Sequence, residues 1–143
     1  MTTTDLAAYR AIFRRAPFIA DVGFELEGLS PGECRTTLVV QPRHLQHTGQ
    51  VHAGVMATMA DHTAGAAAQT TLAQGQFAIT AEFKMSLLRA ARGERLSCVA
   101  RVVKPGRQLV FVESEVFCDE RNEPQLVAKL SATMAVVSAA VSS

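Results

Sequence analysis

The sequence contains no tryptophan, one tyrosine and almost no net charge, with a formal value of +1. It also contains no recognisable nucleic-acid-binding motif, and a chain this close to neutral lacks the basic excess that binding to a phosphate backbone requires. No stretch is long and apolar enough to span a membrane, because Asp61 and His62 interrupt the central apolar run. We therefore expect neither nucleic acid nor a membrane as a partner.

Cysteine is scarce and irregularly placed. Cys34, Cys98 and Cys118 form neither a disulfide framework nor a CxxC metal pattern, so buried reduced thiols are expected. The N-terminal stretch has its arginines after its apolar residues and no small-residue cleavage site behind an apolar block, which does not fit a secretory signal. These features predict a cytoplasmic protein.

The length of 143 residues and the 48% share of hydrophobic residues fit one compact domain, residues 1–143. An N-terminal amphipathic helix is predicted at about 5–16, ended by Pro17, because four apolar residues recur there at helical spacing. These are Leu6, Tyr9, Ile12 and Phe13. A disordered tail is predicted at about 138–143.

Six segments have the alternating or branched composition of strands and are separated by turn residues. They are 20–29, 33–40, 78–88, 95–104, 108–117 and 124–137. A long apolar helix at 53–68 stands between the second and the third. This order predicts an α+β fold in which an antiparallel sheet wraps around a buried central helix.

The central helix carries a single carboxylate, Asp61. An ionised carboxylate is costly to bury unless it is paired or hydrogen-bonded, so a carboxylate in this apolar helix indicates a specific structural or functional role. The residues one or two helical turns away on the same stripe are all small, which leaves room for another backbone or for a ligand. They are Gly54, Ala57, Thr58, Ala64, Gly65 and Ala68. A close helix contact beside a solvated aspartate and a functional site both remain open.

A polar, glycine-containing segment, 46–54, leads into this helix. Free backbone N–H groups at a helix N-terminus can stabilise an oxyanion, although ordinary capping explains the same composition. Ala53 and Asp61 are eight residues apart, which corresponds to about 12 Å along one helix axis. One chain cannot easily bring both to one reacting carbonyl, whereas two helices packed antiparallel across a twofold axis could. The spacing therefore predicts a site shared within a homodimer.

Two further clusters have alternative interpretations. The four histidines and Asp61 match no metal-binding spacing, so no metal is expected; His52 is either an orienting group for backbone or substrate or a loop histidine bound to a carbonyl. Seven of the fourteen basic residues fall between positions 84 and 107, against one acid, Glu94. They suit a polyphosphate ligand or simply keep strand edges soluble. They are Lys84, Arg89, Arg92, Arg95, Arg101, Lys104 and Arg107.

Five motifs in order resemble a known family. They are His52-Ala53-Gly54, Asp61, Gly65-Ala66-Ala67, Thr80-Ala81-Glu82-Phe83-Lys84 and Leu88-Arg89-Ala90-Ala91. Over about residues 20 to 137 the chain resembles the hotdog-fold acyl-CoA thioesterases of the PaaI type. The resemblance implies a hotdog fold, no cofactor, and an obligate homodimer with antiparallel central helices and active sites at the interface, often paired into a homotetramer.

The resemblance also implies roles for individual residues. Asp61 corresponds to the catalytic carboxylate, which acts as general base on water or as nucleophile on the thioester. The backbone N–H of Ala53, where the family usually has glycine, corresponds to the oxyanion donor, with His52 in support. Gln46 corresponds to the residue that binds the thioester or the water, and Thr80 to a hydroxyl that holds the water. The candidates for contacting the substrate, including the phosphates of coenzyme A, are Gly54, Gly65, Arg89, Lys104 and Arg107.

Two other functions stay open at this point. A hotdog hydroxyacyl-thioester dehydratase would normally pair a loop histidine with an acid in a differently built segment, and no FPG-type loop is present. A non-catalytic acyl-CoA sensor would bind the same ligand without turnover. The small residues of the helix indicate room for an aromatic or medium acyl group.

Overall fold

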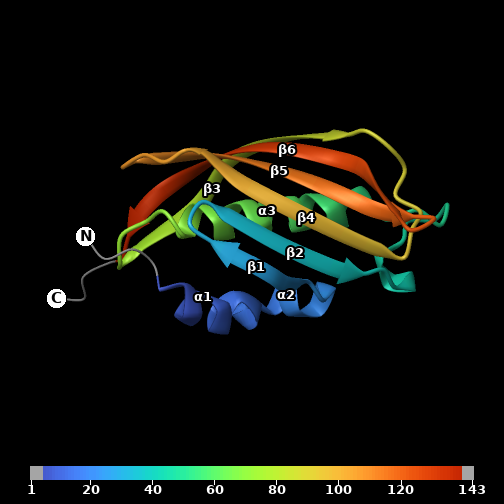
Figure 1. Ribbon diagram of the computed structural model, residues 1–143, viewed down its shortest axis with the longest axis horizontal. Helices are drawn as coiled ribbons and strands as arrows, with labels where there is room; N and C mark the ends of the chain where they lie inside the picture. The colour runs from blue at the N-terminus through green and yellow to red at the C-terminus, as the bar shows by residue number, and fades with distance from the viewer. Residues whose placement is uncertain (1–4, 140–143) are drawn as a thin grey trace.

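A six-stranded antiparallel sheet curves around one central helix (Figure 1). The computed structural model describes residues 5–139. The strands are β1 (Glu25–Ser30), β2 (Glu33–Val39), β3 (Gln76–Leu87), β4 (Arg95–Lys104), β5 (Leu109–Glu120) and β6 (Glu123–Ser138). Their order across the sheet is β1-β2-β4-β5-β6-β3, so β3 crosses over to form an edge. The predicted α+β architecture is confirmed.

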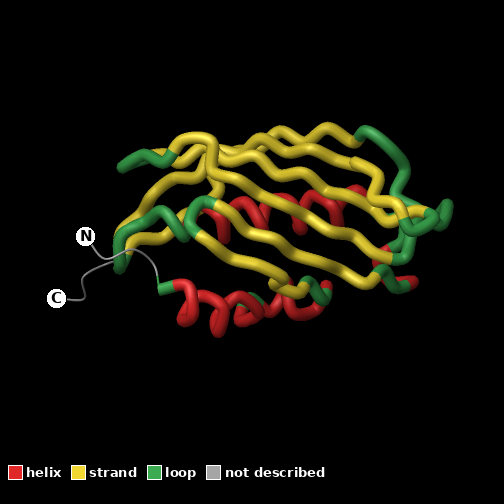
Figure 2. Tube along the Cα trace, in the orientation of Figure 1, coloured by secondary structure: helices red, strands yellow, loops and turns green. Residues whose placement is uncertain are grey.

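One long helix fills the sheet, and shorter helices lie at its β1 edge. The central helix α3 (Ala53–Gln69) lies in its concave face, where it contacts all strands from β2 to β6, and the N-terminal helices run beside β1 (Figure 2). The shorter helices are α1 (Leu6–Ile12), η1 (Phe13–Arg15), α2 (Pro17–Val22) and η2 (Pro42–His44). None of the helices within residues 5–139 is long and apolar enough to cross a membrane.

The N-terminal region differs from its prediction in one respect. The helix expected at about 5–16 is present as α1 and η1, but the strand expected at 20–29 is wrong at its start. Pro17 begins α2 instead of ending all helical structure, since proline is tolerated at the first position of a helix. Gly23, with φ +98°, ends α2 by donating its N–H to Ile19 O, and β1 then begins at Glu25.

The tail predicted at about 138–143 lies mostly outside the residues that the structure describes. Ser138 is the last residue of β6, so the tail predicted from about 138 overlaps this strand by one residue, and residues 140–143 lie outside the described residues.

The core forms between α3 and the sheet. Met59, Ala60 and Ala64 of α3 are fully or almost fully buried. Leu96 and Leu130 are among the fully buried residues that the sheet contributes. Small residues let the helix approach the sheet closely enough for polar contacts. Ser114 Oγ donates to Ala60 O at 2.8 Å, and the Thr36 and Thr63 hydroxyls lie 2.7 Å apart. These contacts fix the rotation of α3, and with it the direction in which Asp61 faces.

The three cysteines are free and buried in this core, as predicted. Burial raises the pKa of the Cys34 and Cys98 thiols to about 12 and also raises that of Cys118. The thiols are therefore uncharged at neutral pH and poorly suited to act as nucleophiles.

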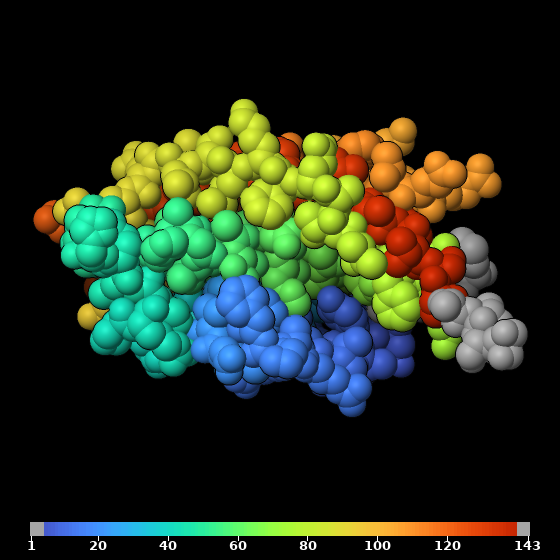
Figure 3. Space-filling model, turned by 180° about the vertical axis from the view of Figure 1, so that it is seen from behind, coloured from blue at the N-terminus to red at the C-terminus, as the bar shows by residue number. Residues whose placement is uncertain are grey.

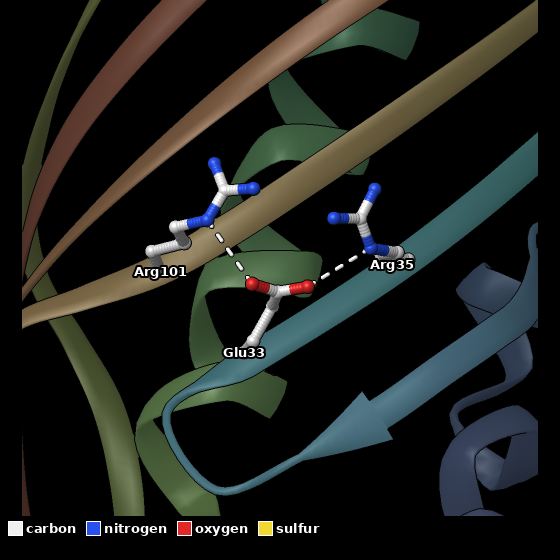
Figure 4. A network of polar contacts seen from close by, with 3 residues as sticks. All are labelled: Glu33, Arg35 and Arg101. Atoms are coloured by element: carbon white, nitrogen blue, oxygen red, sulfur yellow. Dashed lines mark hydrogen bonds and ion pairs between the residues drawn. The ribbon is translucent and has the colours of Figure 1, made fainter.

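The outer face of the sheet carries an ion network where β2 pairs with β4. The Glu33 carboxylate lies between two guanidinium groups (Figure 4), with 2.9 Å from Oε1 to Arg35 Nε and 3.0 Å from Oε2 to Arg101 Nε. Desolvation opposes ionisation of Glu33, but the hydrogen bonds and charges of Arg35 and Arg101 together outweigh it and lower its pKa below the ordinary 4.5. Glu33 therefore ties two strands together as an anion.

We expect Glu33→Gln to lower the free energy of unfolding by about 0.5–1 kcal/mol at neutral pH and low salt, as for other exposed ion networks. Because folding lowers the pKa of Glu33, its contribution is present above the unfolded pKa and is lost as the pH falls through the folded one. Urea unfolding at pH 7 and pH 3, at fixed protein concentration, measures the difference. Glu27→Gln, on exposed β1, is the control, and an equal loss at both pH values would contradict the network.

Candidate active site

The N-terminus of α3 is built around a histidine cap. His52 precedes the helix in an extended conformation, and its Nδ1 accepts a hydrogen bond from Gly54 N at 2.8 Å. A Cβ on Gly54 would lie 3.0 Å from this Nδ1, so a larger residue there would push the imidazole aside by a few tenths of an ångström. Ala53, the first helical residue, has no residue with the required spacing before it in the helix to accept its N–H. Its φ is not positive, so alanine fits without strain.

The loop before the helix is a tight turn. Gln46 N donates to Gln50 O at 2.7 Å, Gly49 adopts φ +87°, and Thr48 N donates to the Gln46 side-chain oxygen. Val51 N donates to Ala91 O at 2.9 Å, which holds the loop against the segment that follows β3. The two segments are therefore held together although they are far apart in sequence.

A cavity of about 640 Å³ opens where these two segments meet the helix N-terminus. It brings together four residues that the sequence singled out, namely Gln46, His52, Ala53 and Arg89. The rest of its lining is His47, Gln50, Val51, Met56, Leu87, Leu88, Ala90 and Ala91. A helix N-terminus, an amide side chain and a guanidinium here face the same space, a combination suited to an anionic or polarised carbonyl ligand.

Asp61 lies two turns further along α3, half-buried, and faces β3. Thr80 Oγ1 donates to Asp61 Oδ1 at 2.7 Å and also lies 3.3 Å from the Met134 sulfur. Thr80 pairs with Met134 across β3 and β6, and the register of β3 shifts directly after Thr80. The hydroxyl thus fixes one carboxylate oxygen in place.

A separate cavity of about 190 Å³ lies at this carboxylate. It is lined by Tyr9, Asp61, His62, Gly65, Ala66, Gln69, Ala78 and Thr80. None of these residues lines the cavity at the helix N-terminus. Within one chain, the acid and the helix N-terminus therefore belong to different cavities, in agreement with their separation of about 12 Å along the helix.

One face of α3 is left uncovered by the sheet. Seen from behind, the helix lies at the surface between the N-terminal helices and β3 (Figure 3). Five residues of the predicted stripe are not fully buried, namely Gly54, Ala57, Thr58, Asp61 and Gly65. The other two residues of the stripe, Ala64 and Ala68, are completely buried, because the turn of the helix carries them round to the sheet.

The four histidines lie in different surroundings. His44 is buried, where its Nδ1 accepts from Gln41 N at 3.0 Å and its Nε2 lies 2.7 Å from Val22 O. The His62 ring packs on Phe13 with 4.7 Å between ring centroids, and burial lowers its pKa, so it is neutral at pH 7. Within residues 5–139 no group of three or more His, Cys, Asp or Glu side chains is placed to hold a metal ion.

The basic residues do not form one patch. Arg89 follows the end of β3, whereas Lys104 and Arg107 lie at the turn between β4 and β5. The pairing of Leu109 with Ala135, and of Ala135 with Ile79, places this turn near the start of β3, at the other end of the sheet from Arg89. Only Arg89 lines the cavity at the helix N-terminus.

Several lining residues were not predicted from the sequence. Tyr9 was assigned only to the apolar face of the first helix, yet it lines the Asp61 cavity. Gln69, at the end of α3, lines it too. Periodicity identifies the buried face of a helix but not what that face contacts, so no local signal could have placed either residue beside Asp61.

Comparison with known proteins determines the family. The sequence profile of the Thioesterase superfamily matches residues 48–125, which run from within the loop before α3 through β5 to the start of β6. The chain belongs to the thioesterase superfamily. It is a hotdog-fold thioester hydrolase. No curated protein sequence matches this thioesterase.

Solved structures agree with this assignment. A thioesterase family protein from Silicibacter pomeroyi is 31% identical, with a TM-score of 0.88 over 90% of this thioesterase and 95% of that protein. A mutant of the phenylacetic acid degradation protein PaaI from Thermus thermophilus is 26% identical, with a TM-score of 0.73 over 83% and 97% of the two chains. A thioesterase from Haemophilus influenzae, 19% identical, shares the fold with a TM-score of 0.84 over 98% and 95%.

Proposed function

We propose that this thioesterase hydrolyses the thioester of an acyl- or aryl-CoA to the free acid and coenzyme A. Asp61 acts as the general base that takes the proton of the attacking water, or as the nucleophile. The observation that carries the proposal is the Thr80–Asp61 hydrogen bond of 2.7 Å on the uncovered side of α3. Thr80 holds Oδ1 and leaves the other carboxylate oxygen to bind water. A carboxylate held in this way is a positioned general base.

The reaction needs three groups around one carbonyl carbon. Water attacks this carbon and gives its proton to Asp61, while the N–H of Ala53 stabilises the oxyanion and the Gln46 amide orients the thioester or the water. Collapse of the tetrahedral intermediate breaks the carbon–sulfur bond, and the leaving thiolate of coenzyme A takes up the proton. Attack by Asp61 itself on the carbonyl would give the same products through an anhydride, which water then hydrolyses.

We propose that each active site is shared between two chains. Asp61 and Ala53 of one chain open into different cavities, so a complete site combines Asp61 of one protomer with the helix N-terminus of a second copy. The strand β3 supports this pairing, because it is a sheet edge of 12 residues with exposed apolar side chains. These include Phe77, Ile79, Phe83 and Leu87. An uncovered edge of this kind normally pairs or is protected.

Antiparallel pairing of two β3 strands would join the sheets and bring the two uncovered α3 faces together. Small residues there, including Gly54 and Ala57, allow close approach of the helices. The same symmetry would bring Arg107 of the second copy to the end of the joined sheet where Arg89 lies. We propose Arg89 first, and Lys104 and Arg107 second, as contacts for the phosphates of coenzyme A.

We expect Asp61→Asn to lower kcat about 100- to 10,000-fold, the usual contribution of a general base, with little change in folding because an amide can still accept from Thr80. The measurement is release of free thiol from short, medium, long and aromatic acyl-CoAs. Asp21→Asn, an exposed aspartate on α2, is the matched control. Tight binding of acyl-CoA without turnover by the wild type would favour an acyl-CoA sensor, and hydration or dehydration of the acyl chain would favour a dehydratase.

Mixing two inactive variants tests whether the site is shared. In a heterodimer of Asp61→Ala and Gln46→Ala chains, one site carries both defects and the other carries neither. A random mixture should therefore recover about a quarter of the wild-type activity, because about half of the dimers are mixed and each has one intact site. Both variants are unfolded and refolded together, and separately as controls. No recovery, in a mixture shown to contain heterodimers, would place both residues in the site of a single chain.

We further propose a homotetramer in which dimers pack through an outer apolar patch on the convex face of the sheet. The members of this patch are all exposed and come from the neighbouring ends of β3, β4, β5 and β6. They are Phe77, Ile79, Val103, Leu109, Phe111 and Val137. Contiguous exposed apolar surface of this kind is typical of protein–protein interfaces.

A cytoplasmic location stays a prediction.

We expect Phe111→Asp to convert tetramers to dimers that keep thioesterase activity, because the change lies on the face opposite to α3 and buries a charge in the dimer–dimer contact. Light scattering after size-exclusion chromatography gives the mass of each species. Lys129→Asp, on the same strands outside the patch, is the control. A wild type that is dimeric at all concentrations would overturn the tetramer.

A further inference from the structure

A second cavity adjoins the Asp61 cavity on the far side of Tyr9. It measures about 490 Å³, against about 190 Å³ for the cavity at Asp61. Its lining is Asp5, Ala8, Tyr9, Ile12, Gln69, Ala73, Gln74, Gly75, Gln76 and Phe77. Tyr9 and Gln69 belong to both linings, so these two side chains form the boundary between the cavities.

The two boundary residues are held very differently. Gln69 is fixed, because its Nε2 donates to Gln76 O at 2.8 Å and its Oε1 accepts from Ala78 N at 3.1 Å. It fastens the start of β3 to the end of α3. Tyr9 projects from α1, a helix of seven residues of which none is fully buried, and its ring packs partly exposed against the edge of the core. The boundary can therefore open by movement of this one ring, whereas opening it at Gln69 would break two hydrogen bonds.

The chemistry of the second cavity suits hydrocarbon better than phosphate. Ala8, Ile12 and Ala73 supply apolar surface, and no basic residue lines it. Its one ionisable carboxylate, Asp5, is already engaged, since it accepts from Ala7 N at 2.9 Å and from Ala8 N at 3.3 Å to cap α1. Burial, with a smaller effect of Cys34, raises the pKa of Tyr9 to about 12, so the ring brings no charge at neutral pH.

The direction of the path from Asp61 to the second cavity also suits an acyl chain. Asp61, Gly65 and Gln69 recur every four residues and line the path from the acid toward the end of α3. That path runs away from the helix N-terminus and covers about 12 Å along the helix axis. The Asp61 cavity alone is smaller than the usual range for sites that enclose a drug-sized ligand, about 300–1,000 Å³, whereas the second cavity falls within that range.

We propose that the second cavity binds the distal part of a straight-chain acyl group and that Tyr9 limits the chain length that reaches it. This rests on the proposed hydrolysis of acyl-CoA at Asp61. Short acyl groups end at the Tyr9 ring, and longer ones must displace it. Tyr9 is thus a specificity-determining residue that contacts the acyl chain rather than the reacting carbonyl.

The test compares hydrolysis of hexanoyl-, octanoyl-, decanoyl- and myristoyl-CoA by the full-length enzyme. Each methylene that becomes buried should raise kcat/KM up to about fourfold, so Tyr9→Ala should raise the ratio of decanoyl- to hexanoyl-CoA hydrolysis by about tenfold or more. Tyr9→Trp should lower this ratio by narrowing the passage. Ala8→Trp, added to Tyr9→Ala, should cancel the gain by filling the second cavity from its other side.

Arg10→Ala is the matched control, because Arg10 is exposed on the same helix and lines neither cavity. Equal changes for all chain lengths in Tyr9→Ala, or an unchanged ratio in both Tyr9 variants, would overturn the proposal and leave the thioesterase function intact. A wild type that releases no thiol from any acyl-CoA would instead refute hydrolysis. Calorimetric affinities of Tyr9→Ala and the wild type for hexanoyl- and decanoyl-CoA would then decide the role of Tyr9, since the same shift in ratio is expected for binding.

Discussion

The rise of an α-helix is the constraint on which the rest of this structure depends. Eight residues separate Ala53 from Asp61, so about 12 Å of helix lie between the N–H suited to an oxyanion and the carboxylate suited to activate water. The proposed mechanism needs both within hydrogen-bonding reach of one carbonyl group. A single straight helix buried against a sheet cannot bend to satisfy this requirement. A twofold arrangement of two helices can, and the small residues on the uncovered face of α3 are the feature that permits it.

The sheet has a free edge strand, β3, through which two chains could pair. The crossover that follows α3 sends β3 to the edge of the sheet beside β6, so the strand that holds Thr80 against Asp61 also offers unpaired backbone to a second chain. In the proposed shared site, the position of the Asp61 carboxylate and the pairing of two chains would therefore depend on the same strand. A change that shifts β3 along β6 would move the Thr80 hydroxyl away from the carboxylate and would also alter the edge. The hydrogen bonds from the Gln69 side chain to β3 resist such a shift.

The sequence predicts the elements of this fold better than their neighbours in space. The helix predicted at 53–68 is present as Ala53–Gln69, and the strand predicted at 95–104 has the same bounds, because periodicity and turn residues act locally. The basic residues show that closeness in sequence does not predict closeness in space. A ten-residue strand spans about 33 Å, so Arg89 and Arg107, 18 positions apart, finish at opposite ends of the sheet. The missed helix α2 has a similar cause, since Pro17 can end one helix and begin the next.

Tyr9 shows most clearly why the candidate site exceeds what local patterns can predict. Its spacing with Leu6 and Phe13 correctly assigns it to the apolar face of a helix, and that face does pack toward the core. However, the helix lies where the sheet leaves α3 uncovered, so packing toward the core also means facing Asp61, 52 positions away in sequence. A hotdog sheet encloses its helix on one side only. Whatever covers the other side, whether N-terminal helix or partner chain, becomes part of the wall around the carboxylate. In the proposed function, the N-terminal segment would therefore help to shape the space for the acyl group, because Tyr9 lines the cavity at Asp61.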